Sequence, residues 1–287
     1  MNILFRADSS SQIGLGHIMR DLVLATHYRD DAIIFACQDL EGNLLSKIPH
    51  PVHILHSNDV KELIELIFSL EIDMVIFDHY GIDAEYEKFI KEQTGVSIMS
   101  LDDTYEKHHC DILLNHNISA DSKRYLQLVP EHCEVRCGST YTLIRDEFKH
   151  EKRIKRVKLY DLFIAMGGAD VTNITPEILR TVDDSLKICV VSTSANQHLK
   201  ELENYSHEKS NITLHINSGE IAKLLHQSHL AIITPSVMVH EVLFMEIPFI
   251  AIQTASNQND LFHYLKQHNY PVLEEWNADA ITQFYHS

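Results

Sequence analysis

Residues 2–25, NILFRADSSSQIGLGHIMRDLVLA, join a short apolar run to an amphipathic stretch through a serine-rich turn with two glycines. The run 2–7 predicts a buried β-strand, and the apolar positions after His17 lie on one face of a helix. Gly14 and Gly16 permit positive φ angles and a close approach of a ligand to the backbone. A strand, a glycine-containing turn and a helix in this order are typical of a doubly wound α/β domain.

Short apolar runs alternate with helical patterns along the rest of the chain. The other predicted strands are residues 32–37, 52–55, 74–78, 96–101, 112–115, 160–166, 186–193, 212–216, 230–234 and 249–253. The predicted helices are residues 59–70, 83–95, 175–182, 196–206, 219–228 and 237–246. We expect Asp59 to cap the start of one helix and Gly95 to end another. This alternation predicts parallel sheets that helices cover on both faces.

The length of 287 residues exceeds the usual size of a single hydrophobic core and predicts two domains. The basic, polar stretch 145–160 is interpreted as the linker between them, and a solvated helix is an equal alternative. We therefore expect one Rossmann-like domain over residues 1–147 and a second over residues 158–287. Two such domains would face a central cleft, which is the natural place for an active site.

The composition is that of an acidic globular protein, with a formal net charge of −17. This charge opposes binding to nucleic acid or to an anionic membrane surface. No apolar run approaches the roughly 18 residues of a membrane span, and the first residues lack the layout of a signal peptide. The five scattered cysteines are interpreted as reduced thiols, so a cytoplasmic protein is expected. The sequence does not fix the oligomeric state, and a monomer is the working hypothesis.

His17 stands at the expected start of the first helix. An imidazole has a reference pKa of about 6.5, and a helix N-terminus disfavours its charged form. We therefore expect a neutral ring that can act as a general base on water or a hydroxyl. A capping or phosphate-contacting histidine without proton transfer is an equal alternative. A dinucleotide fingerprint is disfavoured, because Met19 stands where it requires glycine or alanine.

The second glycine-rich turn, AMGGAD at 165–170, follows the first strand of the second half. Gly167 and Gly168 at the start of a helix favour a diphosphate-binding turn, although ordinary turns between strands and helices also use glycine. Asp170 and Asn173 would either contact a ligand or cap that helix. The turn therefore supports phosphate binding only in combination with other features.

The segment ITPSVMVHEVLFMEIP at 233–248 places Pro235 and Ser236 at the start of a largely apolar helix. Glu241 on this helix is either an exposed, solvating residue or a bidentate acceptor for two ribose hydroxyls. In the next loop, Asn257 and Gln258 would bind sugar hydroxyls or phosphate, or else are ordinary polar loop residues.

Two stretches rich in histidine and cysteine, KHHCD at 107–111 and EHCEVRC at 131–137, lack the C-x₂-C spacing of zinc sites. We interpret them as structural, and we expect neither a metal nor a cofactor. The strand that ends at Asp78 is followed by His79 and Tyr80, which should lie at the same edge of the sheet as His17. No G-x-S-x-G elbow is present, which disfavours a nucleophilic triad.

The sequence resembles the UDP-2,4-diacetamido-2,4,6-trideoxy-β-L-altropyranose hydrolases of pseudaminic acid biosynthesis over nearly its whole length. The resemblance rests on FRADSSSQIGLGHIMRDLVLA, IFDHYGID, CDILLN, EVRCG, YTLIRDEF, MGGAD and HEVLF, which occur in the family's order. The wider group is similar to the peptidoglycan N-acetylglucosaminyltransferase. The resemblance thus implies the two-domain GT-B fold.

The resemblance also implies roles for individual residues. It implies that His17 is the base that activates water. It implies that the second domain holds UDP through Gly167, Gly168, Asn173, Ser236, Glu241, Asn257 and Gln258. It implies that the sugar side is lined by Arg6, Ser9, Ser11 and Tyr80. Two positions depart from the family pattern: Ala169 replaces a serine or threonine, and Pro235 replaces a small polar residue.

The expected reaction is hydrolysis of a UDP-linked 2,4-diacetamido-2,4,6-trideoxyhexose to the free sugar and UDP, with inversion at the anomeric carbon. UDP is a good leaving group, so the paired carboxylates of glycosidases are not required. One alternative is a glycosyltransferase of the same fold that uses a UDP-amino sugar. Another is a non-catalytic protein that binds nucleotide sugars.

Overall fold

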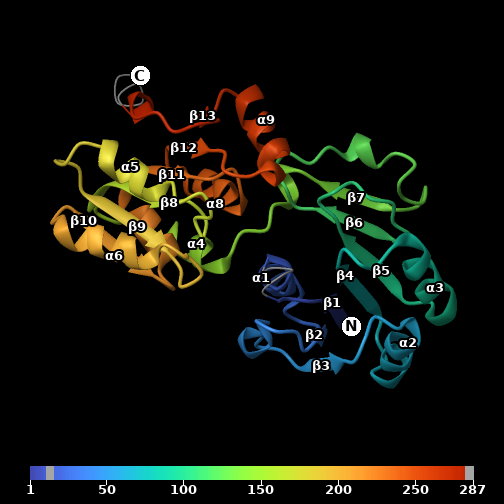
Figure 1. The fold of residues 1–287 in the computed structure, drawn as a ribbon. Helices are drawn as coiled ribbons and strands as arrows, with labels where there is room; N and C mark the ends of the chain where they lie inside the picture. The colour runs from blue at the N-terminus through green and yellow to red at the C-terminus, as the bar shows by residue number, and fades with distance from the viewer. Residues whose placement is uncertain (11–15, 282–287) are drawn as a thin grey trace. The chain divides into compact units, whose positions relative to one another are not determined.

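The computed structural model describes residues 1–10 and 16–281, which fold into two α/β units. The first unit is Met1–Leu143 and the second is Ile144–Ser287. Each unit is built on one parallel sheet, as the alternation of strands and helices predicts (Figure 1). The predicted α/β class with two doubly wound sheets is therefore confirmed.

In its described part, the first unit has a sheet of seven parallel strands in the order β3-β2-β1-β4-β5-β6-β7. Its strands are β1 Asn2–Ala7, β2 Ala32–Gln38, β3 Val52–Leu55, β4 Met74–Asp78, β5 Ser97–Leu101, β6 Ile112–Asn115 and β7 Glu134–Cys137. Its helices are α1 Gly16–Ala25, α2 Val60–Ser69 and α3 Ala84–Thr94. Short 3₁₀ turns cover Thr26–Tyr28, Leu45–Lys47, Ser122–Tyr125 and Ser139–Tyr141.

Strand β1 lies in the middle of this sheet and is buried on both faces. Ile3 and Phe5 belong to the hydrophobic cluster on one face, and Leu4 belongs to the cluster on the other. Successive side chains of a strand point to opposite faces, so an uninterrupted apolar run suits this central position. The helix boundaries also follow the sequence: the Asp59 carboxylate caps α2 through the Lys61 N–H, and Gly95 ends α3 at φ +71°.

The described part of the second unit has a sheet of six parallel strands in the order β10-β9-β8-β11-β12-β13. Its strands are β8 Tyr160–Ala165, β9 Ile188–Ser192, β10 Ile212–Ile216, β11 Ser228–Ile233, β12 Phe249–Ile252 and β13 Val272–Leu273. Its helices are α4 Asp146–Glu151, α5 Thr175–Thr181, α6 Leu199–Glu208, α7 Ile221–His226, α8 Val237–Met245 and α9 Asn259–Gln267, with a 3₁₀ turn at Ser256–Gln258.

Both sheets reverse their strand order beside their first strand. In the first unit β1 pairs with β4, so that Ala7 lies opposite Asp78. In the second unit β8 pairs with β11, so that Ala165 lies opposite Ile233. Ligands of doubly wound sheets bind beyond the carboxyl ends of the strands at such switch points. The turns that follow β1, β4, β8 and β11 are therefore the places to look for a functional site.

The stretch 145–160, interpreted above as a linker or a solvated helix, contains helix α4. Phe148 of α4 is fully buried, and the helix contacts α7 and α8. Lys152 at its end bonds to the Phe244 carbonyl and to Glu246, 2.8 Å away. The stretch therefore packs as part of the second unit rather than as a free connection.

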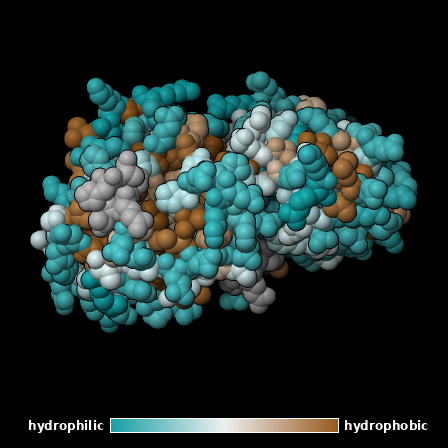
Figure 2. All heavy atoms as spheres, turned by 90° about the horizontal axis from the view of Figure 1, so that it is seen from above, coloured by the Kyte–Doolittle hydropathy of each residue, from teal (hydrophilic) through white to brown (hydrophobic). Residues whose placement is uncertain are grey.

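Polar side chains are frequent on one face of the molecule. Figure 2 shows that hydrophilic residues cover much of the viewed face, with apolar residues in small groups among them. Within residues 1–10 and 16–281, the helices are too short or too polar to cross a membrane.

Candidate active site

His17 lies in the first turn of α1 and is almost fully buried. Its Nδ1 atom is 2.6 Å from Oδ1 of Asp78, the last residue of β4. An ionised carboxylate can only accept a hydrogen bond, so Nδ1 carries the proton of the neutral ring. The lone pair of the ring then resides on Nε2, which gives His17 the form that a general base requires.

The Asp78 carboxylate is fixed by a second residue of α1. Arg20 donates from Nε to Oδ2 of Asp78 at 2.6 Å and from Nη1 to Oδ2 of Asp103 at 2.6 Å. Burial by itself would raise the pKa of Asp78, but the charge and hydrogen bonds of Arg20 and the bond to His17 outweigh it and lower the pKa. Asp78 is therefore a permanently ionised group that orients the imidazole.

Tyr80 lies against His17 at the same edge of the sheet. Its ring meets the imidazole edge-on, with centroids 4.7 Å apart. Its hydroxyl donates to Oδ1 of Asp103 at 2.9 Å, although the residue as a whole is 66% exposed. Partial burial and the negative charge of Asp103 raise the pKa of Tyr80 to about 12. Tyr80 thus remains a neutral phenol beside His17.

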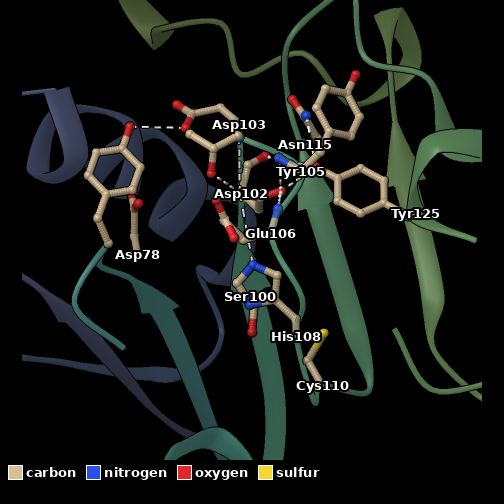
Figure 3. Close-up of polar contacts among 12 residues, drawn as sticks. Asp78, Ser100, Asp102, Asp103, Tyr105, Glu106, His108, Cys110, Asn115 and Tyr125 are labelled. Carbon is tan, nitrogen blue, oxygen red and sulfur yellow. Dashed lines mark hydrogen bonds and ion pairs between the residues drawn. The ribbon is translucent and has the colours of Figure 1, made fainter. Parts of the chain in front are cut away.

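The position of Asp103 depends on its buried neighbour Asp102 (Figure 3). Asp102 accepts from the Tyr125 hydroxyl at 2.6 Å and from the Tyr105 backbone N–H at 2.8 Å. His108 is a further neighbour of Asp102 and bonds to Glu87 at 2.8 Å. Burial opposes the charged form of His108, but Asp102 and Glu87 raise its pKa to about 9. This network fixes the turn after β5 that carries Asp103.

Asp21 is a further buried acid, one helical turn after His17 on α1. In the described part of the chain, neither of its carboxyl oxygens has a hydrogen-bond partner of normal geometry. Burial and the nearby charge of Asp78 raise its pKa well above the usual range. Burial and the neighbouring charge of Asp78 thus favour the protonated form of Asp21.

Two of the residues expected on the sugar side have interior partners. The fully buried Arg6 donates from Nη1 and Nη2 to the Asp8 carboxylate at 2.7 and 2.8 Å, and it also bonds to Asn58. The Ser9 hydroxyl accepts from the backbone N–H of Leu44 at 2.9 Å. These contacts favour roles in holding the turn after β1 rather than in touching a ligand.

Asp8 links this turn to the turn after β4. Its Oδ2 lies 3.0 Å from Nε2 of His79, whose Nδ1 accepts from the Gly81 N–H at 2.9 Å. The accepted bond at Nδ1 places the proton of the neutral His79 ring on Nε2. His79 therefore connects the two turns, and its ring has a structural task next to the exposed Tyr80.

The remaining predicted residues of the first turn are Ser11, Gly14 and Gly16. Ser11 and Gly14 lie outside the described residues. Gly16 is the first residue of α1, and a Cβ atom added there would meet no atom of the described residues within 4 Å.

Backbone conformation and close packing favour glycine at both positions of the pair in the second unit. Gly167 has φ +79°, a region that residues with a side chain rarely adopt. A Cβ atom at Gly168 would lie 3.0 Å from Cγ2 of Thr193. The Gly168 carbonyl accepts from the Thr193 hydroxyl at 2.8 Å. The turn after β8 is thus tied closely to the end of β9.

Asp170 and Asn173 differ in what they do at the start of α5. The Asp170 carboxylate accepts from the N–H groups of Ile174 and Thr175 at 3.1 and 3.0 Å, so it caps this helix. Asn173 precedes α5, which begins at Thr175, and has φ +52°. The buried Oδ1 of Asn173 has no hydrogen-bond partner among the described residues.

Helix α8 begins differently from α5. Ser236 is its N-cap residue, but within the described chain its side chain does not cap the helix; the hydroxyl accepts instead from Thr234 at 3.1 Å. Glu241 in the second turn is buried, so the exposed, solvating alternative is wrong. Arg145 donates to the two oxygens of Glu241 at 2.6 and 3.0 Å. Burial raises the pKa of Glu241, and Arg145 offsets this only in part.

Asn257 and Gln258 belong to the 3₁₀ turn after β12. Gln258 closes this loop, because its Oε1 accepts from the Thr254 N–H at 2.8 Å. Asn257 is exposed. The two residues thus lie at the carboxyl end of a strand that neighbours β11, with Asn257 directed to the surface.

Side chains from the two stretches rich in histidine and cysteine contact one another and a nearby acid. No group of three or more potential ligands has metal-binding geometry in residues 1–10 and 16–281. Cys110 and Cys133 place their sulfur atoms 3.7 Å apart, and His108 is bonded to Glu87. These side chains pack with one another at the far strands of the first sheet.

Known proteins resemble this chain in sequence and in fold. No protein-family model matches the sequence. A protein from Campylobacter jejuni named UDP-2,4-diacetamido-2,4,6-trideoxy-β-L-altropyranose hydrolase is 46% identical over 272 residues, which cover 95% of this chain and 98% of that protein. The chain belongs to this hydrolase family.

Solved structures place the family member in the GT-B fold. MurG from Acinetobacter baumannii matches with a TM-score of 0.61 and 12% identity over 99% of this chain and 90% of that protein. HepE from Anabaena in complex with UDP matches with a TM-score of 0.62 and 12% identity over 100% of this chain and 89% of that protein. At such low identity the likeness supports the fold alone.

Sequence reasoning missed three charged residues of this hydrolase family member. Arg20 binds Asp78, and Asp103 accepts from Tyr80. Arg145 binds Glu241. For Asp103 a signal existed, because it lies two residues after the strand predicted at 96–101. Ligands of doubly wound sheets bind beyond the carboxyl ends of strands, which is the argument that also selected Asp78. For Arg145 the basic composition of its surroundings suggested a linker instead.

Proposed function

We propose that this protein hydrolyses a UDP-linked 2,4-diacetamido-2,4,6-trideoxyhexose to the free sugar and UDP. The observation that carries the proposal is the 46% identity, over nearly the full length of both chains, to the hydrolase from Campylobacter jejuni. The His17–Asp78 pair supports it, since it supplies an oriented base at the switch point of the first sheet. The UDP-bound neighbour HepE has the same fold.

In the proposed mechanism, Nε2 of His17 takes a proton from a water molecule as its oxygen attacks the anomeric carbon. The bond between this carbon and the β-phosphate oxygen breaks, and the electron pair leaves with UDP. Attack from the face opposite UDP inverts the anomeric configuration. The imidazolium that forms is stabilised by the ionised Asp78 and later releases its proton to solvent. Tyr80 contacts the water or the sugar beside the imidazole ring of His17.

The second unit is proposed to bind UDP. Gly167 and Gly168 would let the diphosphate approach the backbone after β8, and Glu241 would accept from the ribose hydroxyls. Of the two helices that begin at this edge, α8 is the better phosphate partner, because the Asp170 side chain already occupies the first N–H groups of α5. The exposed Asn257 is proposed to contact the sugar or the phosphate.

Hydrolysis in water enriched in ¹⁸O tests the proposal. The protein is incubated with UDP-2,4-diacetamido-2,4,6-trideoxy-β-L-altropyranose and no other acceptor, and the products are analysed by mass spectrometry and proton NMR. We expect the label in the free sugar, and the first-formed anomer should have the inverted configuration. Label in UDP would show cleavage at phosphorus and overturn the mechanism. Absence of UDP release without an added acceptor would favour a glycosyltransferase.

A further inference from the structure

We propose that Arg145 is a positioning residue that holds Glu241 as a charged, correctly oriented acceptor for the ribose of the nucleotide. This inference rests on the proposed binding of UDP to the second unit. It assigns a task to a residue in a stretch that the sequence presents as a basic linker, and it concerns how the site tells a ribonucleotide from a deoxyribonucleotide.

The first step concerns the free-energy cost of burying the Glu241 carboxylate. Its side chain is only 2% exposed, and the surrounding turns of α8 are apolar. A carboxylate taken out of water in this way stays ionised only if a cation and hydrogen bonds compensate for the lost hydration. Arg145 provides such compensation: its Nε atom donates to Oε1 at 2.6 Å and its Nη2 atom donates to Oε2 at 3.0 Å.

The second step is that Arg145 is itself held in place. It precedes α4 as the N-cap residue, and its Nη1 atom pairs with Glu147 at 2.7 Å. Its guanidinium group lies 4.8 Å from the ring centre of Phe148, which is fully buried. These contacts fix the plane of the guanidinium group, so its two donors reach the carboxylate as a rigid fork.

The third step concerns what the fork leaves to a ligand. An ionised carboxylate has about four lone-pair positions. Arg145 uses one on each oxygen, which leaves one on each oxygen for the 2′- and 3′-hydroxyls of a ribose. A protonated carboxyl group would carry a hydrogen on one oxygen and could not accept equally at both. Because burial favours the protonated form of Glu241, loss of Arg145 should remove this double acceptor.

The chain contains a matched control for this pair. Arg156 forms the same fork with Glu151, at 2.6 and 3.1 Å, and its side chain is as exposed as that of Arg145, at 29%. Glu151 is the last residue of α4 and also contacts His226 at 3.2 Å, two residues before the amino end of β11. Substitution of Arg156 therefore removes a comparable arginine–carboxylate pair without touching the proposed ribose acceptor.

The experiment compares binding of UDP and of 2′-deoxyuridine 5′-diphosphate by isothermal titration calorimetry. The wild-type protein should bind UDP about 10- to 100-fold more tightly than its deoxy analogue, the range expected for a hydrogen bond to a charged group. In Arg145→Met this ratio should fall to about 1. In Arg156→Met it should stay at the wild-type value. Arg145→Lys, which keeps the charge but lacks the fork, should give an intermediate ratio.

The outcomes separate this inference from the proposed function. A wild-type ratio in Arg145→Met, with UDP still bound, overturns the role of Arg145 and leaves the UDP site intact. A wild-type ratio in Glu241→Gln overturns the assignment of Glu241 to the ribose and the inference with it. Failure of the wild-type protein to bind UDP overturns both proposals. Should Arg145→Met fail to fold by circular dichroism, an unchanged ratio in Arg145→Lys overturns the inference.

Discussion

Asp78 in the first unit and Glu241 in the second are both buried carboxylates that an arginine binds at the switch point of a parallel sheet. The pKa values of the two carboxylates are shifted in opposite directions. The pKa of Asp78 is lowered, because Arg20 and His17 together outweigh the effect of burial. The pKa of Glu241 is raised, because Arg145 offsets burial only in part. The number of partners, and not the degree of burial, thus decides which carboxylate is secure in its charge.

The difference matches the two tasks proposed for these residues. A group that orients a base must keep its charge throughout the reaction, and Asp78 has the partners for that. A group that accepts from a ligand must keep some of its hydrogen-bonding capacity unused, and Glu241 has fewer partners within the described chain. We therefore expect substitutions in the first unit to change turnover and substitutions in the second to change nucleotide affinity.

The largest effect should come from His17→Asn. Removal of the base is expected to lower kcat by about 10²–10⁴-fold, the usual contribution of a general base. The affinity for UDP should stay unchanged, because the proposed nucleotide contacts lie in the second unit. Steady-state kinetics and calorimetry on the same preparation test both statements. Near-normal turnover with normal UDP affinity would remove His17 from the catalytic role.

The next effect should come from Asp78→Asn, with a fall in kcat of about 10²-fold. The asparagine side chain can present an N–H to Nδ1, which favours the ring tautomer that carries its proton on Nε2 and so cannot accept one there. The Michaelis constant should change little. A variant that lost affinity but kept its kcat would show that Asp78 serves binding rather than the base.

Glu241→Gln should show the opposite kinetic pattern. The Michaelis constant is expected to rise about 10-fold or more, since a hydrogen bond to a charged acceptor is replaced by one to a neutral amide. At saturating substrate, kcat should remain within a few-fold of the wild-type value. A loss in kcat alone would place Glu241 in the chemical step and break the contrast between the two carboxylates.

The smallest effect should be in the pH dependence of stability. The lowered pKa of Asp78 means that its contribution is present above the unfolded pKa of about 3.9 and is lost as the pH falls through the folded pKa. The raised pKa of Glu241 means that its contribution is present below about 4.3 and is lost as the pH rises through the folded pKa. In thermal denaturation, the Asp78→Asn variant should therefore lose less stability on acidification than the wild type does. The Glu241→Gln variant should not show this smaller loss.

Most of the sheet architecture could be predicted from the sequence, because the central strands are buried on both faces and appear as unbroken apolar runs such as residues 2–7 and 230–234. Elements at the edges were harder. Strand β7 is short and half-buried, and α9 begins within the polar loop that was considered only for ligand binding.

The site could be predicted only for residues at or just beyond the carboxyl ends of the predicted strands. Position at a carboxyl strand end selects Asp78, Tyr80 and the glycine turns, because they end a strand or closely follow one. It cannot show that a side chain turns inward, as Arg6 does toward Asp8, or that a residue 96 positions away supplies the partner of Glu241. Such pairings depend on packing between elements, which leaves no local pattern in the sequence.

The pKa values of Asp21 and His108 are both raised in the folded protein: that of Asp21 by burial and by the charge of Asp78, and that of His108, against the effect of burial, by Asp102 and Glu87. Both groups therefore bind protons more tightly in the folded protein than in the unfolded chain, where their pKa values return to about 3.9 and 6.5. Near pH 7 the unfolded chain holds fewer protons at these two positions. Unfolding should therefore acidify its surroundings, and the measured heat of melting should depend on the ionisation enthalpy of the buffer.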